Sequence, residues 1–253
     1  MAFDVEQARL RLGGRRIEWY DEIGTTMHAA ARLASAGAPA GTIAGAETQT
    51  DGLGRRGHNW HSPAGEGLYF TQILRIDLPP ERLPVVTLAL GVAVADVLQI
   101  VAGVVPDLRW PNDVLLNGRK VCGILTQLHE GAILAGVGIN VNQPEFPAPL
   151  RAIATSLRIE AGRTFEREPL LAALATSIDS NAHILATGGA VPVLSLFSAA
   201  SSYAEGKRVE VDMPNGLVRG TTAGLTAEGF LRVRTDAGGE TVVTAGGVRP
   251  LDK

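Results

Sequence analysis

The glycine-rich segment from Gln49 to Trp60 holds the residues in this chain that are best suited to chemistry. Its sequence is Gln-Thr-Asp-Gly-Leu-Gly-Arg-Arg-Gly-His-Asn-Trp, with glycines at positions 52, 54 and 57. Glycine lets the backbone curl, so that several N–H groups can face one anion. Arg55 and Arg56 add fixed positive charge, and Trp60 offers a flat apolar surface. This combination suits a phosphorylated ligand that carries a base, such as an adenylate.

The same glycines match the dinucleotide-binding fingerprint Gly-x-Gly-x-x-Gly, and a strand is expected just before them, at 42–47. That fingerprint works where a helix opens at the glycines and its N-terminus meets the pyrophosphate. Here Pro63 and Gly65 follow, and then a strand-like stretch at 67–74, which leaves no room for such a helix. The pattern therefore argues against a nicotinamide nucleotide site. Taken alone, the motif would fit an arginine-bearing surface loop.

A second polar cluster belongs to a predicted run of strands. Arg109-Trp-Pro-Asn-Asp113 follows an extended segment, and the apolar stretches 114–116 and 119–127 flank Asn117-Gly118. This pattern predicts a β-hairpin with a type I′ turn. A third apolar strand is expected at 132–141. One sheet would then carry two cations and three amide side chains: Arg109, Lys120, Asn112, Asn140 and Asn142.

With both clusters in view, the chain resembles the bacterial biotin protein ligases. The resemblance rests on four motifs in order and spacing: Gln49…Gly52-x-Gly-Arg-Arg-Gly57…Trp60, Trp110-Pro-Asn-Asp113, Gly118-Arg-Lys-x-x-Gly-Ile-Leu125 and Gly136-x-Gly-Ile-Asn140. It covers the chain from about residue 17 to the C-terminus. It implies an α+β fold, with a mixed-sheet catalytic domain of the biotin/lipoate ligase (class II synthetase-like) type at 1–203. A small all-β, SH3-like barrel is expected at 204–253.

The implied reaction has two steps. Biotin and ATP, supplied with Mg²⁺, form biotinyl-5′-AMP and pyrophosphate, and a lysine of a biotin carboxyl carrier protein then takes the biotin and releases AMP. Both steps place or move negative charge on phosphate oxygens, so fixed positive charge and orientation matter more than a covalent nucleophile. No tightly bound prosthetic group is expected. A lipoate ligase and a non-catalytic biotin-binding sensor are the alternatives.

The resemblance assigns roles position by position. The catalytic residues are expected to be Arg109, Arg55 and Lys120. Biotin is expected to contact Thr25, Thr26, Gln49, Gly52, Arg55 and Gly123. The nucleotide is expected to contact Arg55, Arg56, Trp60, Asn112, Lys120 and Asn140. Asp113 could help to hold Mg²⁺, or could instead brace Arg109 or the backbone.

Several of these residues depart from the family pattern or have a simpler explanation. Arg109 stands where the family usually has lysine, and Leu53 where some relatives have another arginine. Arginine keeps the charge and adds bidentate geometry. Without the resemblance, Lys120 could be an ordinary solvated lysine beside a turn. The threonines at 25 and 26 could simply cap a helix that runs to about residue 37.

Composition sets the remaining limits. At 253 residues the chain can form one large and one small domain, and a net charge of −3 with pI ≈ 6.0 argues against a general nucleic-acid binder. Cys122 lies among apolar strand residues and is expected to be a buried, reduced thiol. The N-terminus lacks a secretion signal, which predicts a cytoplasmic protein. The 24 residues before Thr25 are too few for the winged helix-turn-helix of regulatory relatives, so a ligase without a repressor domain is expected, as a monomer or homodimer.

The helix and strand pattern completes the expected architecture. The stretch 85–105 is apolar enough to raise the question of a membrane span, but it contains Asp96 near its middle. A charge at mid-bilayer costs roughly 2.5–3.5 kcal/mol, so a buried core helix is favoured. Further helices are predicted at 168–185 and 192–203. From residue 206 the pattern changes to short alternating strands, at 208–212, 216–222, 229–234 and 240–243.

Overall fold

A seven-stranded mixed sheet forms the body of the protein in the computed structural model, which describes residues 2–214 and 216–251. Its strands are β1 (Ile17–Ile23), β2 (Ile43–Gln49), β3 (Gly67–Leu74), β4 (Asp107–Arg109), β5 (Asp113–Leu116), β6 (Arg119–His129) and β7 (Ala132–Asn140). They lie in the order β1-β2-β3-β7-β6-β5-β4, with β1 and β2 parallel and the other neighbours antiparallel. The predicted α+β class is confirmed.

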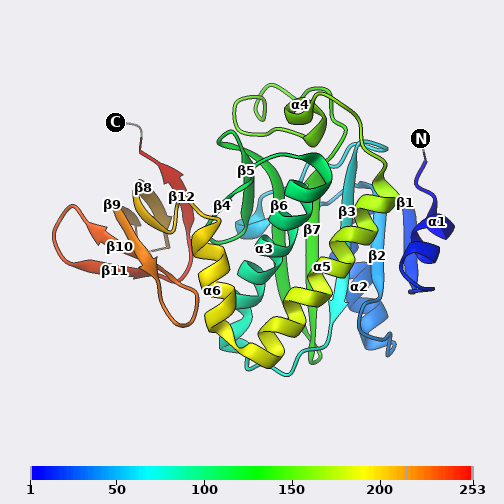
Figure 1. Cartoon of the computed structure of the whole chain (residues 1–253), viewed down its shortest axis with the longest axis horizontal. Helices are drawn as coiled ribbons and strands as arrows, with labels where there is room; N and C mark the ends of the chain where they lie inside the picture. The colour runs from blue at the N-terminus through cyan, green and yellow to red at the C-terminus, as the bar shows by residue number, and fades with distance from the viewer. Residues whose placement is uncertain (1, 215, 252–253) are drawn as a thin grey trace.

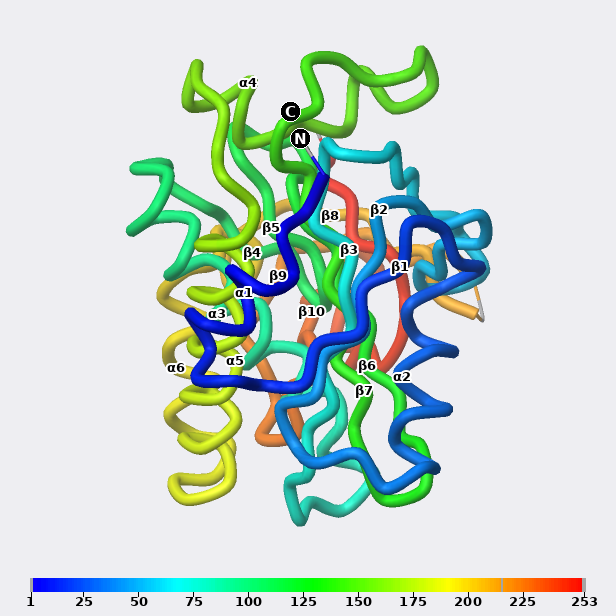
Figure 2. Tube along the Cα trace, turned by 90° about the vertical axis from the view of Figure 1, so that its right-hand side faces the viewer, coloured from blue at the N-terminus to red at the C-terminus, as the bar shows by residue number. Residues whose placement is uncertain are grey.

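Helices cover both faces of this sheet. They are α1 (Val5–Arg11), α2 (Thr26–Ser35), α3 (Leu83–Ala102), α4 (Leu157–Ala161), α5 (Arg167–Gly188) and α6 (Ala190–Ala199), with short 3₁₀ turns η1 (Arg55–Gly57) and η2 (Pro80–Arg82). Helices α3, α5 and α6 pack side by side on one face, and α2 lies on the other (Figures 1 and 2). The face opposite α3 thus has room for a site beside α2.

The apolar helix α3 is the central element of the core, as its sequence predicts. Pro80–Ala102 is, within the described part of the chain, the one helical segment long and apolar enough to cross a membrane. Of an apolar stretch of 18 residues within it, however, 78% is buried inside the protein. Asp96 points outward from it. Gly103, with φ 69°, adopts the left-handed conformation that commonly ends a helix. This burial is that of a core helix in a soluble protein.

A five-stranded antiparallel sheet follows at the C-terminal end. Its strands are β8 (Glu205–Met213), β9 (Gly216–Leu225), β10 (Leu231–Thr235), β11 (Glu240–Val243) and β12 (Gly247–Pro250), in the order β11-β10-β9-β8-β12. The sheet is fastened to the body by specific bonds: Trp110 Nε1 donates to Gly229 O at 2.9 Å, and Arg82 Nη1 donates to Ala227 O at 2.9 Å. It therefore lies beside the Trp110-Pro-Asn-Asp113 segment (Figure 1).

One element prediction needs correction, and the sequence patterns miss two further elements. Helix α6 ends at Ala199 rather than near residue 203, because the Ala200 carbonyl accepts a hydrogen bond from Leu108 N at 2.9 Å and the chain turns toward β4. Helix α1 and strand β12 were not predicted. Both are short, and both depend on contacts with distant segments, since Asp4 N donates to Glu168 and β12 pairs with β8.

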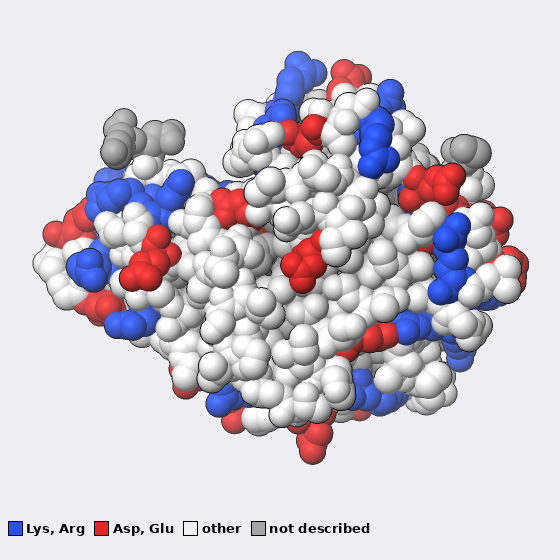
Figure 3. Space-filling view, in the orientation of Figure 1, with Lys and Arg blue, Asp and Glu red and all other residues white. Residues whose placement is uncertain are grey.

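Charge on the visible face agrees with the composition. Lysine and arginine alternate with aspartate and glutamate over the C-terminal sheet, and few charged groups lie over α3, α5 and α6 (Figure 3).

Candidate active site

The glycine-rich segment folds as a small hairpin instead of opening a helix. Trp60 N donates to Gly52 O at 2.8 Å, and Gly54 N donates to His58 O at 2.7 Å. The 3₁₀ turn η1 closes the tip, with Arg56 in the left-handed region at φ 58°. Because no helix follows the glycines, the dinucleotide-fingerprint interpretation is excluded.

This hairpin forms one wall of a cavity of about 880 Å³. Strands β6 and β7 supply its floor, α2 one end, and the C-terminal sheet the opposite side. The predicted residues that line it are Thr25, Thr26, Gln49, Arg55, Arg56, Trp60, Arg109, Asn112, Asp113, Lys120 and Gly123. Residues from four separate sequence segments therefore meet at one site.

Two predicted site residues lie elsewhere. Gly52 borders a second, shallower hollow of about 350 Å³, which shares Gln49, Asn59 and Trp60 with the main cavity. Asn140 is buried in the framework, where its Nδ2 donates to Thr155 O at 3.0 Å and to Lys120 O at 3.4 Å. Through these two hydrogen bonds Asn140 holds the backbone of β6 at Lys120 and the backbone at Thr155.

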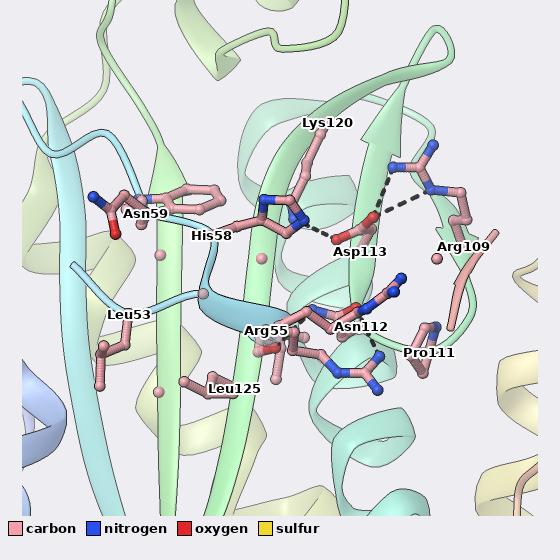
Figure 4. A pocket seen from close by; sticks show the side chains of 18 of the residues that line it. Leu53, Arg55, His58, Asn59, Arg109, Pro111, Asn112, Asp113, Lys120 and Leu125 are labelled. Carbon is pink, nitrogen blue, oxygen red and sulfur yellow. Dashed lines mark hydrogen bonds and ion pairs between the residues drawn. The ribbon is translucent and has the colours of Figure 1, made fainter. Parts of the chain in front are cut away.

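Two cations converge on one carboxylate at the polar end of the cavity (Figure 4). Arg109 Nη2 donates to Asp113 Oδ2 at 2.7 Å, and Lys120 Nζ forms an ion pair with Asp113 Oδ1 at 2.5 Å. Burial alone would raise the pKa of Asp113, but the charges of Lys120 and Arg109 outweigh it and hold the pKa below its ordinary value. The carboxylate is therefore ionised and keeps both cations in place.

The β5–β6 hairpin explains why Lys120 and Asp113 meet. Asn117 and Gly118 have φ values of 48° and 76°, as a type I′ turn requires, and β5 and β6 pair directly across it. A register shift between Val114 and Leu115 bends the pair. The predicted turn is confirmed, and it returns the chain so that both side chains face the cavity.

Arg55 lies at the tip of the loop hairpin and points toward the same cluster (Figure 4). Its Nη1 donates to Asn112 Oδ1 at 3.4 Å, while Asn112 Nδ2 is held by Ile124 O at 2.9 Å. Burial lowers the pKa of Arg55, and the charge of Asp113 partly offsets this. An anion bound here would offset the desolvation of the Arg55 guanidinium by forming charge-assisted hydrogen bonds with it.

The opposite end of the cavity combines an apolar slot with amide and hydroxyl groups. Gln49 Oε1 accepts from Thr26 N at 2.9 Å and from Thr26 Oγ1 at 3.2 Å. Thr25 caps α2, since its side chain accepts from Met27 N at 3.4 Å, and it also lines the cavity. Capping and site lining thus coexist. The apolar lining is supplied here by Met27, Leu53 and Leu125.

The C-terminal sheet contributes wall residues that the sequence did not indicate. Asp212 and the segment 246–250 line the cavity, and Arg56 Nη1 donates to Asp212 Oδ2 at 2.8 Å. No motif marks these positions, because the short strand β12 becomes part of the site only by pairing with β8.

The carboxylates of the cavity wall are engaged by cations, which bears on the expected magnesium. Asp113 binds Arg109 and Lys120, and Asp212 binds Arg56. Across residues 2–214 and 216–251, no group of three or more His, Cys, Asp or Glu side chains could hold a metal ion. A protein-held Mg²⁺ fits this donor set poorly, and of the two roles expected for Asp113 the geometry favours bracing. Mg²⁺ is commonly held largely by substrate phosphates.

Cys122 stands apart from this chemistry. It is a free, fully buried cysteine in β6, and burial raises the pKa of its thiol. Such a thiol is inert as a nucleophile. The predicted burial of this cysteine is confirmed.

Comparison with known proteins agrees with this architecture. Residues 19–143 match the biotin/lipoate A/B protein ligase family, and residues 206–248 match the biotin protein ligase C-terminal domain. The bifunctional ligase/repressor BirA of Bacillus subtilis is 34% identical over 95% of this chain and 78% of its own length. The biotin–[acetyl-CoA-carboxylase] ligase of Mycobacterium tuberculosis is 33% identical over 93% of this chain and 88% of its own length.

Structural similarity extends over both sheets. The biotin protein ligase from Aquifex aeolicus in complex with biotin and ATP superposes with a TM-score of 0.82 at 28% identity, covering 93% of this chain and 99% of that one. The predicted fold, a mixed-sheet domain followed by a small all-β unit, is therefore confirmed. The chain belongs to the biotin protein ligase family.

Proposed function

We propose that the protein is an ATP-dependent ligase that forms biotinyl-5′-AMP and transfers biotin to a lysine of a biotin carboxyl carrier protein. The observation that carries the proposal is one cavity with a cationic end around Arg109, Lys120 and Arg55, and an apolar end closed by Gln49 and the threonines of α2. A ligand with an apolar body, a polar head and an anionic tail fits such a cavity.

The proposed roles follow this polarity. Biotin's ureido head is placed against Thr25, Thr26 and Gln49, and its carboxylate toward Arg55 and Arg109. The α-phosphate of Mg·ATP is placed against Arg109 and Lys120, with Arg56, Trp60 and Asn112 on the nucleotide. The carboxylate oxygen attacks the α-phosphorus, the bond to the pyrophosphate breaks, and the cations stabilise the charge that shifts onto phosphate oxygens. The carrier lysine then attacks the acyl carbon and expels AMP.

Residues 1–203 and 204–253 are proposed as the catalytic and C-terminal domains, with Gly123 contacting biotin through its backbone. The reaction needs no tightly bound prosthetic group, nucleic acid or membrane. We place the protein in the cytoplasm. Its proposed partner there is the carrier domain of a biotin-dependent carboxylase.

The test is pyrophosphate release from Mg·ATP, with biotin and lipoate in parallel reactions and an Arg109→Ala variant beside the wild type. Release with biotin alone, lost in the variant, is the expected result. Pyrophosphate release with lipoate alone would show that the substrate is lipoate and not biotin. Measurable biotin binding with no release would mean that the protein is a sensor and not an enzyme.

A further inference from the structure

Two glycines face each other on the floor of the cavity, and the indole of Trp60 lies on them. Gly123 in β6 and Gly138 in β7 are register partners. A Cβ at Gly138 would lie 2.6 Å from Cε2 and 2.7 Å from Nε1 of the indole, and one at Gly123 would lie 2.8 Å from its Cζ3. Neither glycine has a positive φ, so the backbone would tolerate alanine. The absence of a side chain at these two positions therefore makes room for the indole.

Polar groups contribute little to holding this ring. Trp60 Nε1 is buried and has no hydrogen-bond partner among the described residues. The ammonium of Lys120 lies 5.4 Å from the ring centroid, which is a loose cation–π contact. The steric fit of the indole against the two glycines is therefore its closest contact with the cavity floor.

The ring is in turn part of the loop hairpin. Trp60 N is bonded to Gly52 O, Leu53 and Asn59 form a β-bridge, and Gly54 N is bonded to His58 O. These bonds tie the ring to the turn that carries Arg55, so a shift of the indole away from the floor is passed on to the hairpin.

We propose that Gly138 is a positioning residue for adenylate formation. Its bare Cα lets Trp60 rest directly on β7, and this contact sets the height of the loop hairpin and of Arg55 above the cavity floor. The inference rests on the function proposed above. It predicts that a single methyl group at position 138 disturbs the site through Trp60 alone.

The test is a double-mutant cycle of Gly138→Ala and Trp60→Ala, measured by biotin-dependent pyrophosphate release. Gly138→Ala is expected to raise the KM for biotin and for ATP by about tenfold or more, because it displaces Arg55, whose proposed contacts are with both ligands. In the Trp60→Ala background the same methyl should change either KM by less than about twofold, since its clash partner is gone. Equal effects in both backgrounds, or a wild-type KM in Gly138→Ala, would overturn the inference.

A second readout does not depend on activity. The chain has three tryptophans, so acrylamide quenching of Trp60 is obtained by subtracting a Trp60→Phe variant from its parent. Gly138→Ala should increase this quenching, while Gly91→Ala should not, because a Cβ at Gly91 meets Leu108 at an ordinary 3.7 Å. Unchanged Trp60 quenching in Gly138→Ala would contradict the proposed contact between Trp60 and Gly138, whether or not the wild type releases pyrophosphate. A wild type that releases no pyrophosphate would separately refute the proposed function.

Folding of the variants also discriminates. If Gly138→Ala fails to fold and the double variant with Trp60→Ala folds, the methyl acts through the indole, as proposed. If both fail to fold, the methyl disrupts β7 itself and the inference is wrong.

Discussion

The ammonium of Lys120 lies 2.5 Å from a carboxylate oxygen of Asp113, diagonally across the β5–β6 hairpin, in which Asp113 is paired with Gly123. The other oxygen of Asp113 is bound by Arg109, so one carboxylate offsets the repulsion between two neighbouring cations and holds both in place. The cationic end of the cavity is therefore preorganised before any anion arrives.

Replacing Asp113 by asparagine is expected to destabilise the fold and impair the reaction. The side chain of Asp113 is only 14% exposed, and the change leaves two neighbouring cations uncompensated. We expect the free energy of unfolding to fall by ~1–3 kcal/mol in guanidinium titrations. Asp236→Asn is the matched control, because the Arg208–Asp236 pair is exposed, and it should leave the free energy of unfolding nearly unchanged. Equal losses in the two variants would contradict this role of Asp113.

Arg109→Lys should retain most of the activity that Arg109→Ala loses. Lysine keeps the positive charge facing Asp113 and the bound anion, although it lacks the second donor that arginine directs at Asp113 Oδ2. We expect Arg109→Ala to lower kcat by about 10²- to 10³-fold and Arg109→Lys by less than about tenfold, measured as pyrophosphate release. If lysine were as damaging as alanine, the guanidinium geometry and not its charge would be required.

The loop hairpin at 50–60 is expected to become protected when ligands bind. Its three glycines make it easily disordered when empty, and an acyl adenylate must be shielded from water once formed. Hydrogen–deuterium exchange of this segment should slow markedly with biotin and Mg·ATP, while the buried helix α3 stays unchanged. Equal exchange with and without ligands would show that the loop does not close.

The buried ion pair of Glu47 and Arg167 should contribute strongly to the free energy of unfolding, because it joins β2 to α5. Arg167 Nη1 donates to Glu47 Oε2 at 2.9 Å, and Glu47 also accepts from Phe3 N and Gly65 N. Arg167→Met would strand a buried carboxylate and is expected to cost about 3–5 kcal/mol of unfolding free energy. Adding Glu47→Gln should recover part of that loss, and an additive loss would contradict the pairing.

The same pair predicts a dependence on acid. Burial would raise the pKa of Glu47, but the hydrogen bonds and charge of Arg167 outweigh it, so the pKa in the folded protein lies below its ordinary value. A depressed carboxyl pKa gives stability that is present above the unfolded value of about 4.3 and is lost as pH falls through the folded value. Unfolding free energies measured from about pH 5 to 3 should therefore fall less steeply in Glu47→Gln than in the wild type. Parallel curves would assign the acid sensitivity to other groups.

Local patterns predicted the elements whose signals lie within one segment. The apolar run of α3, the Asn117-Gly118 turn and the threonine cap of α2 each carry their own instructions in neighbouring residues, and the structure has all three. The four motifs also identified the family, since their order and spacing are features of the sequence itself. Most of the expected site residues were found in this way, although their contacts with ligand stay predictions.

Other features depend on contacts between distant segments. The sequence by itself determined the α+β class, the motif set and the cationic character of the site. Only the tertiary structure decided that Asp212 and the segment 246–250 form a wall of the cavity, that Asn140 turns into the framework, and that Gly138 supports Trp60. The physical reason is that strand pairing and close packing join residues far apart in the chain, and no local pattern records which pairs will meet.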